Sequence, residues 1–251
     1  MLYAALTFWL LIIVFSAWGV HRLWSGLIKP RVVNSILLPG TLVAQLGHVL
    51  GLLVTGNSVK NTKLMGDDES GEPKTDTPDK QRIPIIGPIL IGLLPLVACG
   101  GLLYFVAKLW GGGILSGMTT NANGVEVMLP LALDGVWSLL RDCITLVERM
   151  VNAIVSSRPL NWTTLLFLYL AICLTVRMAP FEGNRRGTIG AILLAGVVIG
   201  IIDSLPTGAH GFVTSSWPIL TFTVAMLLFL LMVSLVVTGV VGIIRILVNK
   251  E

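Results

Sequence analysis

Six long runs of apolar residues constrain the fold of this chain more than any other feature. They cover residues 3–27, 35–56, 84–110, 160–180, 188–206 and 216–248. A helix needs about 20 apolar residues to cross the ~30 Å hydrocarbon core of a bilayer, and each run reaches or approaches that length. Only 12% of the residues are charged, where soluble domains carry about 25%. We predict an all-α, polytopic membrane helix bundle in which residues 1–251 form one integral membrane domain with five or six membrane segments.

The first apolar run is interpreted as a retained anchor. No Lys or Arg precedes it, it exceeds the usual length of a signal-peptide core, and no small-x-small cleavage site stands out before His21 and Arg22. We expect those two residues to face lipid headgroups.

Basic residues near the membrane predict the orientation, because Lys and Arg of short loops stay in the cytoplasm. Arg22, Lys29 and Arg31 precede segment 35–56, and residues 57–83 hold five Lys or Arg, whereas 111–125 and 204–216 hold none. Both ends of segment 35–56 would then be cytoplasmic. A re-entrant hairpin broken at Pro39-Gly40 fits this pattern. An ordinary kinked span fits too, because the acidic residues of the following loop weaken the signal.

Two segments differ from the apolar runs. Residues 57–83 form a polar loop, predicted to be cytoplasmic and flexible because its stretch 66–82 has almost no apolar side chain to bury. Residues 126–157 carry a polar stripe at three- and four-residue steps, which predicts an amphipathic helix. Four charges between residues 141 and 149 would each cost about 2.5–3.5 kcal/mol at the bilayer centre, so this helix is placed at the membrane interface.

A polar pair interrupts the second apolar run, in the sequence Ala44-Gln45-Leu46-Gly47-His48. In the motif H-E-x-x-H, two histidines one helical turn apart bind zinc and the glutamate acts as general base. Here Ala44 replaces the first histidine and Gln45 replaces the glutamate.

The chain resembles a degenerate member of the site-2-protease-like intramembrane zinc metallopeptidases, in a bacterial branch with a "PGxxxHELSHxL" pattern. The matching landmarks, in chain order, are Pro39-Gly40, Leu46, His48, Leu50, Gly56 and Val59, then Ile91-Gly92, Pro95-Leu96 and Gly100, then Tyr169-Leu170, Met178, Pro180 and Gly187. Phe181 and Asn184 stand where the branch has Ser and Asp. Asp134, in "PLALDG", matches the Leu-Asp-Gly that supplies a third metal ligand in the family.

The resemblance implies a former zinc site whose remaining candidates are His48 and Asp134, with His210 or Asp203 as further donors. A catalytic zinc needs about three protein ligands, and Gln45 cannot take up a proton as glutamate does. We therefore expect no catalytic residue, metal or cofactor, and a vestigial pocket of Ala44, Gln45, His48 and Asp134. Gly47 and Gly51 form a small-residue face suited to helix contact.

The expected function is that of a catalytically inactive scaffold or accessory subunit in a membrane protein complex. A solute or ion transporter or channel component, and a residual membrane metallopeptidase, stay open as alternatives. The expected partners are the lipid bilayer and other membrane subunits, with no nucleic acid and no small-molecule substrate identified. The expected location is a bacterial cytoplasmic membrane. Cys99, Cys143 and Cys173 share no metal-type spacing and are expected to be inert thiols.

Overall fold

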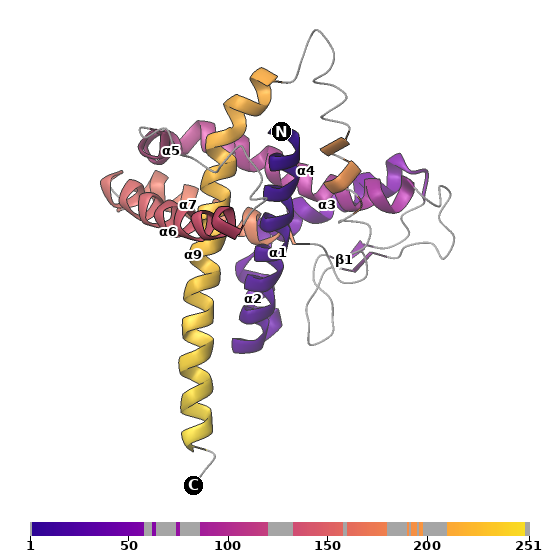
Figure 1. Ribbon diagram of the computed structural model, residues 1–251. Coiled ribbons are helices and arrows are strands. Elements are labelled where there is room, and N and C mark those ends of the chain that lie inside the picture. The colour runs from indigo at the N-terminus through magenta and orange to yellow at the C-terminus, as the bar shows by residue number, and fades with distance from the viewer. Residues whose placement is uncertain are drawn as a thin grey trace.

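The computed structural model is built mainly of helices, as predicted. It describes residues 2–57, 62–63, 74–75, 86–119, 133–157, 160–179, 190, 192–194, 196–197 and 210–248. The helices are α1 (Leu2–Leu27), α2 (Pro30–Ile36), α3 (Leu38–Val54), α4 (Ile86–Trp110), α5 (Gly112–Thr119), α6 (Leu133–Ser156), α7 (Trp162–Val176) and α9 (His210–Val248). Figure 1 shows α1 and α9 side by side, with α4 running across their direction and α3 packed against α4.

The structure also contains one short strand pair, which the sequence analysis did not anticipate. Strands β1 (Thr62–Lys63) and β2 (Lys74–Thr75) are antiparallel. They lie within the loop 57–83, which was predicted to be flexible because it lacks apolar side chains. A two-residue ladder is joined through backbone N–H and C=O groups, so it forms without an apolar face.

The predicted five or six membrane segments are not confirmed. By length and composition, the described residues contain three candidate spans, which are Ala5–Leu27, Gly87–Trp110 and Trp217–Ile244. The bent pair of α2 and α3 would add a fourth. The run 160–180 yields only the 15 residues of α7, a length of about 22 Å at ~1.5 Å per residue. Most of the run 188–206 lies outside the described residues.

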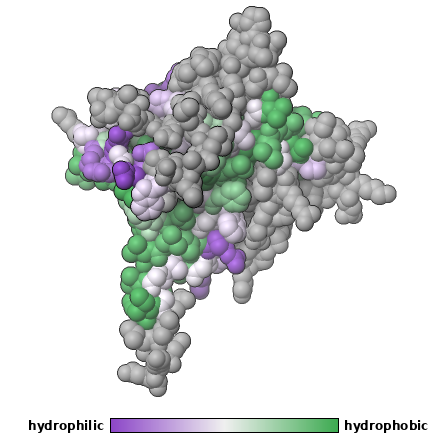
Figure 2. All heavy atoms as spheres, in the orientation of Figure 1, coloured by the Kyte–Doolittle hydropathy of each residue, from purple (hydrophilic) through white to green (hydrophobic). Residues whose placement is uncertain are grey.

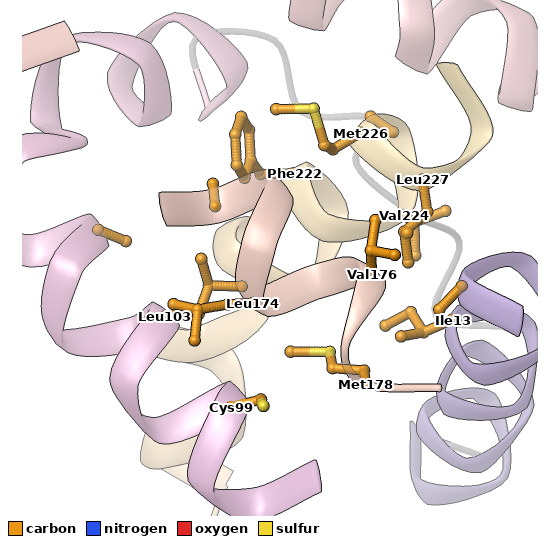
Figure 3. Packing of buried hydrophobic residues seen from close by; sticks show 14 of the residues in the cluster. Ile13, Cys99, Leu103, Leu174, Val176, Met178, Phe222, Val224, Met226 and Leu227 are labelled. Carbon is orange, nitrogen blue, oxygen red and sulfur yellow. The ribbon is translucent and has the colours of Figure 1, made fainter. Parts of the chain in front are cut away.

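The buried core lies where α1, α4, α7 and α9 meet (Figure 3). Ile13 of α1, Leu103 of α4 and Leu174 of α7 are almost fully buried there. Phe222 of α9 packs against Phe167 of α7, with ring centroids 5.4 Å apart. In the same bundle, the indole Nε1 of Trp24 donates a hydrogen bond to the Ser234 hydroxyl at 2.8 Å, which ties α1 to α9.

A bend of 85° separates α2 from α3 at Leu37. Pro39 lies in the first turn of α3, where its missing N–H removes no helical hydrogen bond. The carbonyl of Ile36 accepts a hydrogen bond from the Tyr169 hydroxyl at 2.9 Å and a weaker one from the Cys173 thiol at 3.6 Å. Side chains of α7 therefore satisfy the backbone group that the bend frees. Both the re-entrant hairpin and the kinked span contain such a bend.

The carboxy-terminal half of α9 extends beyond the other helices (Figure 1). Its 39 residues give a length of about 58 Å, nearly twice the ~30 Å hydrocarbon core. Figure 2 shows this half as a largely hydrophobic surface. The exposed apolar residues include Met232, Val236, Val240 and Ile243. A surface of this kind suits acyl chains better than water.

Candidate functional site

The Ala44–His48 segment lies in the middle of α3 and faces the helix bundle. Ala44 is fully buried and Gln45 is 3% exposed, whereas Leu46 points outward and is 55% exposed. His48 is half-buried. The face that would hold metal ligands in a metallopeptidase is therefore a packed face of this helix.

Two glycines on this face bring α3 into direct contact with the backbone of α4. A Cβ built on Gly47 would lie 2.7 Å from the Leu94 carbonyl oxygen and 2.7 Å from Pro95 Cα. A Cβ on Gly51 would lie 2.9 Å from Ile91 Cα. Only glycine permits this approach, so the predicted small-residue face is confirmed and its contact is α4.

His48 makes its polar contact with the same part of α4. Its side chain hydrogen-bonds the backbone of Ile91. Pro95 lies inside α4, four residues after Ile91, and a proline has no N–H to donate to the carbonyl four residues before it. The imidazole therefore satisfies a carbonyl that Pro95 deprives of its helical partner. Neighbouring helices satisfy freed carbonyls of this kind in other membrane helices with internal prolines.

The residues around His48 do not fit a zinc site. Ala44 is fully buried and offers no donor atom. The described residues contain no group of three or more His, Cys, Asp or Glu placed to hold a metal ion. Asp134 lies in the first turn of α6, whose main contacts are with α5 and α9. The Asp134 side chain lies outside the described part of the structure, and so do Asp203 and the side chain of His210.

A second polar cluster lies at the bend between α2 and α3 and centres on Arg177. This arginine follows directly after α7 and is 4% exposed. Its Nη2 donates to Oδ1 of Asn34 in α2, and its Nη1 donates to Nε2 of His21 in α1 at 3.3 Å. A Cβ on Gly40 of α3 would overlap the Cys173 carbonyl and approach Arg177 Cγ to 3.1 Å. One guanidinium thus connects the end of α7 to α1 and α2, beside the start of α3.

The Arg177 cluster was missed in the sequence analysis, which expected His21 to face headgroups. The structure places His21 partly inside the bundle, in contact with Arg177. The partners of Arg177, which are His21 and Asn34, lie more than 140 positions before it in the sequence, so no local spacing could reveal them. Asn34, a polar residue directly after the apolar pair Val32-Val33, was the one local signal.

The three cysteines are free, and Cys99 and Cys173 are buried. In the amphipathic helix α6, burial and then the neighbouring Asp142 carboxylate raise the pKa of the Cys143 thiol. A raised pKa keeps the thiol protonated and poorly nucleophilic.

Comparison of the chain with protein-family models, curated proteins and solved structures finds no match. The metallopeptidase resemblance drawn from the sequence motifs therefore stays a prediction.

Proposed function

We propose that the chain is a catalytically inactive, metallopeptidase-like membrane protein that serves as a scaffold or accessory subunit of a complex in a bacterial cytoplasmic membrane. The observation that carries the proposal is the use of the Ala44–His48 segment in packing. Gly47 contacts the α4 backbone, and His48 bonds the Ile91 carbonyl beside Pro95. An intramembrane hydrolase needs an open metal position and a water there. This segment is instead suited to holding two helices together.

The partner in this proposal is another membrane protein. Apolar side chains remain exposed on α3, α4 and the second half of α9, so the bundle keeps broad apolar surfaces available for neighbours in the membrane. The polar groups of the Ala44–His48 segment and of the Arg177 cluster make contacts between helices of this chain.

The test is intact-complex mass spectrometry of the full chain purified in mild detergent, combined with metal analysis and a membrane-peptide cleavage assay. The proposal expects a second membrane protein at fixed stoichiometry and no cleavage. A matched variant carrying Ala44→His and Gln45→Glu, which restores the family pattern, is expected to gain no peptidase activity. Cleavage by the wild-type chain that is lost in His48→Ala, or a chain that never carries a stoichiometric partner, would refute the proposal.

A second candidate function is that of a transporter or channel component, and the bend at Leu37 favours it. Transporters often bind solutes where a membrane helix is interrupted. Here the interruption lies beside the buried Arg177, Asn34 and His21, and buried ionisable residues in membranes often mark solute paths. Flux of an anionic solute into proteoliposomes, abolished by Arg177→Gln and retained in Arg22→Gln, would favour transport over a scaffold. Arg22 is the matched control because it is exposed at the end of α1.

A further inference from the structure

Helix α6 presents three distinct strips of side chains. The first strip is buried and faces α5 and α9; it contains Leu146, Met150 and Ala153. The second strip is apolar but exposed; it contains Trp137, Ile144, Val151 and Val155. The third strip is polar and exposed; it contains Arg141, Glu148 and Asn152.

The two exposed strips run parallel to each other along the helix. Residues seven apart lie almost on one line of an α-helix, which aligns Trp137, Ile144 and Val151. Arg141 and Glu148 follow a second line that is shifted by roughly 40° around the axis. Figure 2 shows the hydrophilic residues of α6 gathered beside an apolar surface. The helix therefore has a polar flank, formed by the third strip, beside an apolar flank, formed by the second strip. The described part of the chain covers neither flank.

The position of α6 in the fold is that of a helix packed against a candidate membrane span. α6 contacts α9, a candidate membrane span, and crosses it in Figure 1. Just after α6, Leu160 and Trp162 are among the most exposed apolar side chains of the described residues. Indole side chains such as those of Trp137 and Trp162 favour the headgroup level of a bilayer. A helix that lies across a candidate span, with one tryptophan near its start and another just after its end, matches an interfacial position.

The charges of α6 indicate which lipids it needs. Residues 133–156 contain two arginines and three acidic residues, so the helix has no excess positive charge. Attachment to the membrane must then come from the apolar flank rather than from attraction to anionic headgroups.

We propose that α6 is a lipid-binding surface that lies in the bilayer interface, with Trp137, Ile144, Val151 and Val155 in the acyl-chain boundary and Arg141 and Glu148 in the headgroup water. The bound partner is the bilayer itself, and zwitterionic phosphatidylcholine is sufficient. This surface is separate from the α3–α4 contact, so it stands whether or not the proposed scaffold function does.

The test uses spin labels on the full-length chain in phosphatidylcholine nanodiscs. Cys99 and Cys173 are buried, so a Cys143→Ser background leaves an introduced surface cysteine as the reactive site. Labels are placed by Ile144→Cys and Val151→Cys on the apolar flank, and by Arg141→Cys and Glu148→Cys on the polar flank. Collision rates with oxygen, which concentrates in acyl chains, and with a water-soluble nickel chelate are then compared. Val236→Cys on the exposed half of α9 is the reference for an apolar surface outside α6.

The proposal expects the oxygen-to-nickel ratio at positions 144 and 151 to exceed that at 141 and 148 several-fold. It also expects the ratios to stay unchanged when anionic lipid is added. Equal nickel access at all four positions would place the helix in water and overturn the proposal. Exclusion of both reagents from positions 144 and 151 would show that a protein partner, including a second copy of this chain, covers the flank, and would overturn it as well.

Discussion

The hydrogen bond between His48 and the Ile91 carbonyl gives a prediction that couples two residues on different helices. If the imidazole replaces the amide that Pro95 lacks, then His48→Leu is costly only while residue 95 is a proline. Leucine keeps most of the packing volume but leaves the carbonyl without its donor. In a Pro95→Ala background the new N–H can reach Ile91, and the imidazole becomes dispensable.

The size of this coupling follows from what interhelical hydrogen bonds contribute in membranes. Double-mutant cycles in a membrane helix bundle average about 0.6 kcal/mol and reach about 1.7 kcal/mol. A carbonyl that loses a donor in an apolar setting belongs in the upper part of that range, since an unsatisfied buried group costs about 1–3 kcal/mol in proteins generally. We expect a coupling free energy of about 1 kcal/mol between His48→Leu and Pro95→Ala.

The assay is the free energy of unfolding of the four proteins of the cycle, measured by steric trapping in bicelles. Pro218→Ala is the matched control, because Pro218 lies inside α9 and should not change the cost of His48→Leu. Independent substitutions add to within about 0.3–0.5 kcal/mol. A coupling inside that margin, or an equal effect of Pro218→Ala, would refute the hydrogen-bonding role of His48.

Substitutions test three further contacts around α3. Gly47→Ala should destabilise the chain by about 1–3 kcal/mol through overpacking, whereas Gly101→Ala on α4, where a Cβ meets nothing within 4 Å, should stabilise it by up to about 1 kcal/mol; equal unfolding free energies would contradict the close α3–α4 contact. Arg177→Met should cost at least about 1–3 kcal/mol by leaving buried polar partners unsatisfied, with Arg177→Lys a poor substitute because an ammonium cannot reproduce the guanidinium fork; full rescue by lysine in a thermal unfolding assay would disprove that geometry. Tyr169→Phe should cost about 0.6 kcal/mol and raise amide exchange near the bend at Ile36; unchanged exchange there would show that the hydroxyl does not hold the bend.

Much of the helical architecture could be predicted from the sequence, because long apolar runs have few alternatives to helices in a bilayer. The small-residue face of α3 was also readable, since Gly47 and Gly51 lie one turn apart on the side opposite the exposed Leu46. The number of membrane spans could not be predicted in the same way. Helix α7 ends at Val176 after 15 residues, and a run of apolar residues does not reveal where a helix ends.

The polar contacts could not be predicted from the sequence, for a different reason. Each joins residues that are distant along the chain, such as His21 with Arg177 or Tyr169 with Ile36. The role of His48 could have been suspected from Pro95, which must free the carbonyl at position 91. The sequence alone, however, could not show that this carbonyl faces α3.

The amphipathic helix shows how tertiary contacts divide a pattern that looks simple in sequence. Residues 126–157 were predicted to form an amphipathic helix with a polar stripe along one face. In α6 Met150 is buried against the bundle, whereas Ile144 and Val151 are exposed. Only the position of α5 and α9 decides which apolar residues remain for a lipid surface.

The zinc content of the purified chain, and of the variant that carries Ala44→His with Gln45→Glu, shows whether the Ala44–His48 segment binds metal; it is measured by mass spectrometry of the metal. Because this segment is packed against α4, we expect well below one zinc per chain in both proteins. One equivalent of tightly held zinc in the wild-type chain, lost in His48→Ala, would show instead that the segment is a metal site.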